Sequence, residues 1–83
     1  MKSDEKRDFK DRLFEQFERI GQGLASARRL ELLEVLAQGE WSVESLARET
    51  SMSVSNTSRH LQILRDAEMA TARRDGVTIY YKI

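Results

Sequence analysis

Hydrophobic positions between residues 53 and 67 repeat at helical spacing. They follow one another at steps of three and four residues: Val54, Thr57, Leu61 and Leu64. This spacing places them on one face of an α-helix, and that face would pack against the hydrophobic core. Ser53 stands where an N-cap hydroxyl can accept the first backbone amides. We therefore predict a helix from Val54 to about Ala67.

Polar side chains occupy the opposite face of this helix: Ser55, Asn56, Arg59 and Gln62. No Asp or Glu occurs from Thr50 through Arg65, although acids and bases alternate elsewhere in the chain. Short polar side chains around an arginine, without carboxylates to repel phosphate, suit a helix that enters a major groove and reads base edges. The alternative is a polar surface helix that contacts only water.

An amphipathic helix is also predicted near the N-terminus, starting at Asp8 and ending near Gly21 or Gly23. Its apolar stripe consists of Phe9, Leu13, Phe14, Phe17, Ile20 and Leu24. The mostly charged residues 1–7 are expected to form a frayed lead-in. Three of the six aromatic residues lie on this stripe. Such an apolar surplus favours a homodimer interface at Phe9, Leu13, Phe14, Phe17 and Ile20, the alternative being packing on the chain's own core.

Two further helices precede the polar-faced one. Ser26 can cap a helix from Ala27 to about Gln38, which is apolar over most of its circumference. Ser42 can cap a short helix from Val43 to about Thr50. Only Thr50–Ser53 then separate this short helix from the next, which is the spacing of a helix-turn-helix.

The period changes to two after Ala67. Segments 69–74 and 77–83 flank Asp75-Gly76, a pair typical of a type I′ hairpin loop. The sequence thus predicts a β-hairpin with Arg73 and Arg74 at its tip. A hairpin directly after a recognition helix is a wing, whose arginines can reach a minor groove or phosphates. Basic hairpin tips also occur merely for solubility.

Composition bounds the class of protein. The 83 residues suit one small domain, with 14 basic and 14 acidic side chains and a net charge of zero. Residues 1–52 hold 9 bases and 11 acids, whereas residues 53–83 hold 5 bases and 3 acids. There is no cysteine, and no apolar run approaches the roughly 18 residues of a membrane span. The polar N-terminus does not resemble a signal peptide, so we expect a cytoplasmic protein.

Four motifs in order and spacing resemble the ArsR-type winged-helix repressors. They are LASARRLELL (24–33), GEWSVESLA (39–47), SVSNTSRHLQILR (53–65) and RRDGVTIYY (73–81). The likeness covers residues 8–83 and implies a mainly α fold with a small β-hairpin, a winged helix-turn-helix. It also implies a homodimer that binds double-stranded DNA at an inverted repeat. We expect half-sites about one helical turn apart.

The resemblance further implies which residues contact DNA. Ser55, Asn56, Ser58, Arg59 and Gln62 would face the major groove, and Arg73 and Arg74 would make wing contacts. Family members release DNA when an inducer binds, often a metal ion. Here the Cys-x-Cys pair of metal-sensing members is missing, and His60 is the only histidine. A single histidine does not make a stable metal site, so no metal or cofactor is predicted and the inducer stays open.

Two glycines of the family are replaced, by Ser51 and Glu68. If these positions require a positive φ, each replacement costs on the order of 1 kcal/mol. Ile63 falls on the exposed side of its helix, where nothing in the sequence indicates what covers it.

Two other function classes were weighed against DNA reading. A serine hydrolase using His60 and Asp66 lacks a nucleophile elbow, and so short a chain has little room for a pocket, so no enzyme is predicted. A winged helix can also serve as a protein interaction module that reads no DNA. We predict a sequence-specific DNA-binding transcriptional regulator, in the sense of a repressor, with the interaction module as the alternative.

Overall fold

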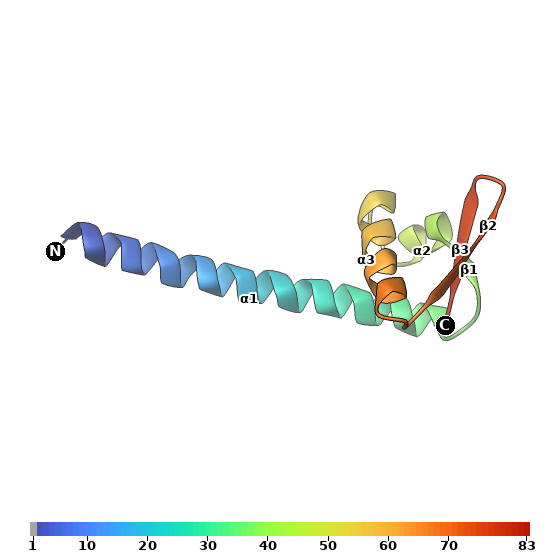
Figure 1. The fold of residues 1–83 in the computed structure, drawn as a ribbon, viewed down its shortest axis with the longest axis horizontal. Coiled ribbons are helices and arrows are strands. Elements are labelled where there is room, and N and C mark those ends of the chain that lie inside the picture. The colour runs from blue at the N-terminus through green and yellow to red at the C-terminus, as the bar shows by residue number, and fades with distance from the viewer. Residues whose placement is uncertain (1) are drawn as a thin grey trace.

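The computed structural model describes residues 2–83, and the side-chain surroundings from residue 4 onward. Its elements are α1 (Lys2–Leu36), β1 (Trp41–Ser42), α2 (Val43–Glu49), α3 (Val54–Asp66), β2 (Thr71–Asp75) and β3 (Thr78–Lys82). The C-terminal end of α1, the two short helices and the sheet pack together, while the rest of α1 projects away from them (Figure 1). The molecule consequently measures 61 × 22 × 22 Å.

Helix α1 is continuous, so the prediction of two helices separated near Gly21 and Gly23 was wrong. Residues 2–7, predicted as a frayed lead-in, form its first turns, whereas Met1 lies outside the described residues. Glycine inside a helix costs only about 1 kcal/mol relative to alanine, and no proline is present to break the backbone. Helix-favouring neighbours therefore carry the helix through both glycines, and Ser26 caps nothing.

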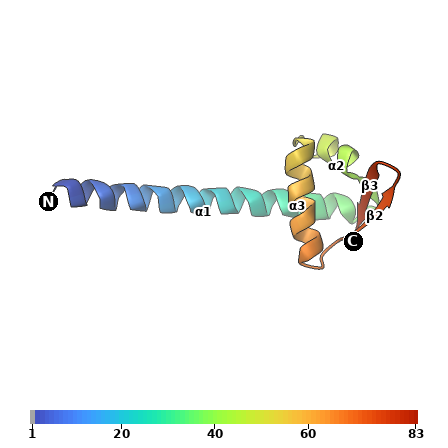
Figure 2. The ribbon, with the colours of Figure 1, turned by 45° about the horizontal axis from the view of Figure 1, so that its top comes forward.

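The hydrophobic core lies where α1, α2, α3 and β3 meet. Its buried members are Leu32, Leu36, Val43, Leu46, Leu61, Leu64, Ala70 and Tyr81. Helix α3 crosses the C-terminal part of α1 at a steep angle (Figure 2). Thr57, Leu61 and Leu64 are buried as predicted, but Val54 is 49% exposed because it precedes the first turn that reaches the core.

The apolar stripe near the N-terminus of α1 packs on nothing within the described chain. Its side chains are exposed by 42% to 65%: Phe9, Leu13, Phe14, Phe17, Ile20 and Leu24. The alternative that the stripe packs on the chain's own core is therefore wrong for this conformation. Ile63 on α3 is likewise 44% exposed, as its position on the helix predicted.

Serine caps fix the helix-turn-helix. Ser42 Oγ accepts a hydrogen bond from the Ser45 amide at 3.1 Å, and Ser53 Oγ accepts one from the Asn56 amide at 3.1 Å. Both caps satisfy backbone donors that have no partner inside the helix. The predicted caps of α2 and α3 are confirmed.

The wing is a hairpin of β2 and β3, extended to three strands by β1, in the order β1-β3-β2. Trp41 pairs with Tyr81, an interaction that the sequence did not predict. Asp75 pairs with Thr78, so the two-residue loop is Gly76-Val77 and not Asp75-Gly76. Gly76 has φ +63°. Glycine with positive φ at the first loop position indicates a type II′ turn in place of the predicted type I′.

Ser51 and Glu68 both adopt the left-handed conformation, with φ 55° and 59°. Each follows a helix and is part of the same C-terminal motif. The Ser51 amide donates to Arg48 O and the Met52 amide to Ala47 O; the Glu68 and Met69 amides donate to Arg65 O and Leu64 O. This is the Schellman pattern, which favours glycine at the left-handed position.

Replacing Glu68 with glycine should therefore stabilise the protein. We expect Glu68→Gly to raise the free energy of unfolding by about 1 kcal/mol, because glycine carries no Cβ penalty at this φ. Urea unfolding at fixed protein concentration measures the change. Glu68→Ala is the matched control, since it removes the charge and keeps the Cβ. Equal stabilisation by both variants would contradict the backbone explanation.

Candidate nucleic-acid interface

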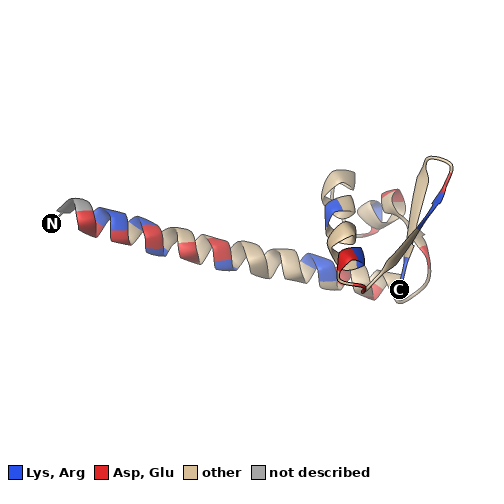
Figure 3. Ribbon diagram, viewed as in Figure 1, with Lys and Arg blue, Asp and Glu red and all other residues tan. Residues whose placement is uncertain are grey.

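The outer face of α3 presents the polar residues predicted to read DNA. Ser55, Asn56, Arg59 and Gln62 are exposed, and Ser58 is half-buried. Acidic residues are absent from α3 until Asp66 in its last turn (Figure 3). The buried face of the same helix holds Thr57 and Leu61, both at 0% exposure, so the core fixes which side faces outward.

Hydrogen bonds along α3 hold this face in place. The Arg59 guanidinium donates to Asn56 Oδ1 at 3.2 Å, and the Ser53 and Ser55 hydroxyls lie 3.5 Å apart. The arginine is thereby kept along the exposed helix surface, where a base edge or phosphate can replace the Asn56 amide as acceptor. The bidentate contact between an arginine side chain and guanine is the commonest specific contact in the major groove.

The two wing arginines have different surroundings. Arg73 Nε and Nη2 donate to the two carboxylate oxygens of Glu40 at 2.9 and 2.6 Å, and its guanidinium lies 4.5 Å from the centre of the Tyr80 ring. The hydrogen bond from Arg73 lowers the pKa of Glu40, and the same bond raises the pKa of Arg73. This bidentate pair ties the wing to the segment before β1.

Arg74 lies one residue closer to the turn, opposite Ile79. Adjacent strand residues point to opposite faces of a sheet, so Arg74 projects away from the Glu40 pair. No acidic group in the described residues lies within ion-pair distance of Arg74. Its charge is therefore available to a ligand, and that of Arg73 is already compensated.

Glu40 was missed by the sequence reading. It stands 33 residues before Arg73, and the pairing of both β1 and β2 with β3 brings the two together. No local pattern marks such a partner. Among the predicted residues, the fold places the α3 set on one helix face and Arg73 and Arg74 on the separate wing.

His60 packs inside the fold. Its side chain is 8% exposed, and Nδ1 has no hydrogen-bond partner in the structure. Burial, reinforced by Arg29, Arg59 and Arg28, lowers the pKa of His60. Of the two roles open to it, a phosphate contact or helix packing, the structure supports packing.

No metal or membrane feature accompanies this surface. The described residues contain no group of three or more His, Asp or Glu that could hold a metal ion. No described helix is long and apolar enough to cross a membrane.

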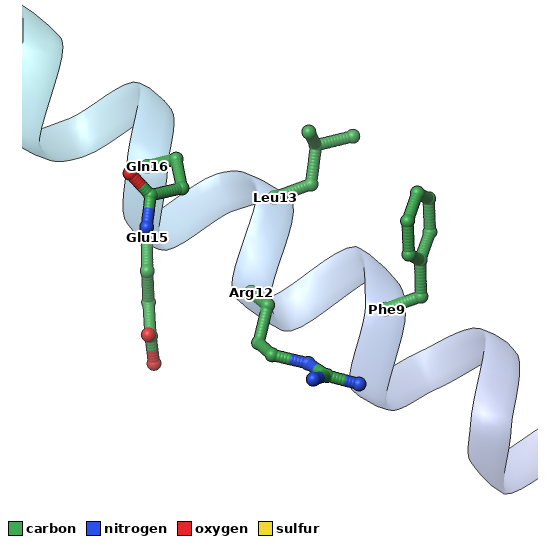
Figure 4. Close-up of a pocket in the computed structure, with 5 residues that line it drawn as sticks. All are labelled: Phe9, Arg12, Leu13, Glu15 and Gln16. Carbon is green, nitrogen blue, oxygen red and sulfur yellow. The ribbon is translucent and has the colours of Figure 1, made fainter.

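A shallow hollow on α1 is lined by Phe9, Arg12, Leu13, Glu15 and Gln16. Phe9 and Leu13 lie on one side of the helix, and Arg12 and Glu15 point to the other (Figure 4).

Comparison with known proteins identifies this arrangement. The model of the arsR family of bacterial regulatory proteins matches residues 26–72, from the C-terminal part of α1 into β2. The chain is 43% identical over 76 residues to the HTH-type transcriptional regulator Rv0324 of Mycobacterium tuberculosis. The chain belongs to the ArsR family. Its winged helix-turn-helix is the fold of the DNA-binding domain of a possible ArsR-family regulator, and the curated relatives it matches are named as transcriptional regulators.

Further relatives are similar to the chain in fold or in sequence. The homodimeric winged helix-turn-helix DNA-binding domain Mb0332 (fragment 1–100) of Mycobacterium bovis superposes with a TM-score of 0.68, at 44% identity, over 86% of this chain and 66% of that one. The transcriptional repressor SdpR of Bacillus subtilis is 29% identical over 64 residues, which are 77% of this chain and 71% of SdpR. The match to Rv0324 spans 92% of this chain and about a third (34%) of that regulator.

The lowered pKa of His60 makes stability depend on pH. The folded protein resists protonation of His60, whereas the unfolded chain takes up the proton near the ordinary pKa of 6.5. Stability is therefore full above that pH and falls as the pH drops through it, by at most about 1.4 kcal/mol per pH unit.

Urea unfolding at about pH 7 and about pH 5.5 tests this, since His60 is the only side chain that ordinarily titrates in that interval. His60→Gln should show a much smaller change between the two pH values. An unchanged pH dependence in the variant would contradict the assignment.

Proposed function

We propose that this ArsR-family chain acts as a cytoplasmic homodimeric repressor that reads an inverted-repeat operator through α3. The observation that carries the proposal is the exposed face of α3, which is polar, contains Arg59 and holds no carboxylate until the last turn. An electrically mixed surface helix would place acids next to phosphates. This face instead accepts a phosphate backbone on either side and base edges in the middle.

Ser55, Asn56, Ser58, Arg59 and Gln62 are the proposed base-reading and groove-contacting residues. Asn56 offers the amide that suits adenine, and Arg59 the guanidinium that suits guanine. Both lie in the N-terminal half of α3, the part of a recognition helix that contacts base edges. The first-turn amides of α3 that Ser53 does not cap add a favourable dipole for phosphate.

The wing supplies contacts beside the groove. Arg74 is the stronger candidate for a phosphate or minor-groove contact because its charge has no acidic neighbour within ion-pair distance in the described chain. Arg73 would have to leave Glu40 to bind phosphate directly. We assign to Arg73 mainly the role of positioning the wing. Any contact that it makes with DNA would be made while it remains paired with Glu40.

Dimerisation through α1 would cover the exposed stripe. Phe9, Leu13, Phe14, Phe17 and Ile20 have no packing partner in the described chain. Burying each such side chain contributes about 1.5–3 kcal/mol. The homodimeric state named for the Mb0332 domain supports this assignment. Two copies related by a twofold axis would read two half-sites of an inverted repeat.

Repression is supported by the name of SdpR, a transcriptional repressor that is 29% identical to this chain over 64 residues. A dimer bound to two half-sites blocks the DNA that it covers, which is the simplest regulatory action of such a complex. The described residues offer no cluster of metal ligands, so the signal that would release the operator has no assigned site here.

Arg59→Ala should remove base reading at one position. We expect operator affinity to fall by about 10- to 100-fold, with preference relaxed at the contacted base pair. Selection of bound sequences from a random duplex pool, followed by fluorescence anisotropy at two salt concentrations, measures both effects. Arg12→Ala is the control, because Arg12 pairs with Asp8 on the projecting part of α1. An unaltered sequence preference in Arg59→Ala would contradict base reading by Arg59, and the absence of any sequence preference in the folded parent chain would favour the protein interaction module instead.

Phe17→Asp should dissociate the dimer, because it places a charge in the middle of the apolar stripe. Analytical ultracentrifugation is expected to show monomer for the variant and dimer for the parent chain. Binding to a two-half-site duplex should weaken at the same time. The matched control is Glu15→Ala, on the other side of α1. A Phe17→Asp chain that remains fully dimeric would show that this stripe is not the interface.

A further inference from the structure

We infer that the two α1 helices of the dimer run antiparallel, in a register that places Leu13 against the partner's Leu24 and Phe17 against the partner's Ile20. The inference rests on the proposed homodimer and specifies the geometry of its interface. Its occupant is a second copy of this chain. The argument comes from the direction of the stripe, the charges at its two ends and the spacing of the DNA-reading units.

The stripe faces away from the winged helix-turn-helix. At about 100° per residue, Leu13, Phe17, Ile20 and Leu24 centre on a direction roughly 110° from that of the buried Leu32 and Leu36. The partner's α1 can therefore lie along this α1 without meeting the α3 or the wing that pack on it. Figure 1 shows this length of α1 bare of other elements up to α3.

The spacing within the stripe defines the layers of a helix pair. Leu13 and Ile20 take one core position of a seven-residue repeat, and Phe17 and Leu24 take the other. In an antiparallel pair, the core position of Leu13 and Ile20 on one helix packs against the core position of Phe17 and Leu24 on the other. A twofold axis between residues 18 and 19 then joins 13 to 24 and 17 to 20, so all four apolar layers are filled.

Charges at the ends of the stripe select this orientation. The same repeat continues to Lys6 and Lys10 on one side and to Ala27 and Glu31 on the other. Antiparallel helices place Lys6 against the partner's Glu31, and Lys10 against the partner's Ala27. Parallel helices in register would place Lys6, Lys10 and Glu31 each against the same residue, which destabilises the pair at three layers.

The flanks of the stripe fit the same register. Phe14 would lie beside the partner's Gly21, where an added Cβ meets nothing within 4 Å in the single chain. Exposed Leu30 would lie beside the partner's Phe9. One flank brings Arg7 near the partner's Arg28, but Arg28 is already paired with Glu31 at 3.1 Å. Gly21 inside an exposed helix thus leaves room for the aromatic side chain of the partner's Phe14.

The register also sets the distance between the two reading units. The helix-turn-helix packs over α1 near residues 28–32, since Arg28 donates to Thr50 O at the end of α2 and Leu32 shares the core with Leu61 of α3. Equivalent residues of this segment lie roughly 30–40 Å apart along an antiparallel pair, at 1.5 Å per residue. One turn of DNA is about 34–36 Å. Parallel helices would instead put both units at one end.

Engineered cysteines test the orientation directly, because the chain contains none of its own. Leu13→Cys and Leu24→Cys chains are purified separately, mixed, exchanged and oxidised, with a mass tag on one chain. The antiparallel register brings residue 13 next to the partner's residue 24. It separates residue 13 from the partner's residue 13 by about 16 Å, far beyond the reach of a disulfide.

We expect the mixed disulfide to exceed either homodisulfide by about tenfold or more, given that separation. Glu15→Cys, on the other side of α1, is the control and should cross-link with neither chain. Predominant homodisulfides of Leu13→Cys and Leu24→Cys would overturn the antiparallel register while leaving the homodimer intact. Absence of any disulfide in chains that sediment as dimers would overturn α1 pairing at this stripe. Chains that sediment as monomers in every arm would instead refute the proposed homodimer itself.

Discussion

Packing between α1 and α3 is the constraint on which the remaining structure depends. Leu32 of α1 and Leu61 of α3 are both completely buried, and Leu36 and Leu64 extend the same contact. This contact decides which side of α3 faces outward and therefore which residues can meet a ligand. It also fixes the direction of the projecting part of α1 relative to α3. A single apolar contact thus orients both the reading surface and the apolar stripe.

The wing depends on a second, polar interaction that spans the chain. Arg73 donates two hydrogen bonds to the Glu40 carboxylate and lies over the face of Tyr80, which brings the segment before β1 against the hairpin. Exposed ion pairs usually contribute little to stability. A bidentate pair is nevertheless geometrically specific. Its main effect is to reduce the freedom of the hairpin relative to α2 and α3.

Sequence patterns within single segments predicted much of this structure. The contacts between distant segments were not predicted. Ser42 and Ser53 were identified as caps because capping is local, and Thr57 and Leu61 as buried because helical spacing is local. The Glu40–Arg73 pair and the pairing of Trp41 with Tyr81 join residues far apart in the chain. The break predicted near Gly21 failed because glycine weakens a helix without ending it. DNA contacts by residues such as Arg59 remain predictions.

Under the proposed function, the absence of acids from α3 before its last turn has a consequence for how this chain searches a genome. The chain as a whole is electrically neutral, so beyond roughly a Debye length of about 8–10 Å it exerts little attraction on DNA. Attraction develops only when the α3 face is turned toward the duplex at short range. Encounters are consequently slower than for a strongly basic protein, but few copies are sequestered on bulk chromosomal DNA. A small number of molecules per cell would then suffice to keep one operator occupied.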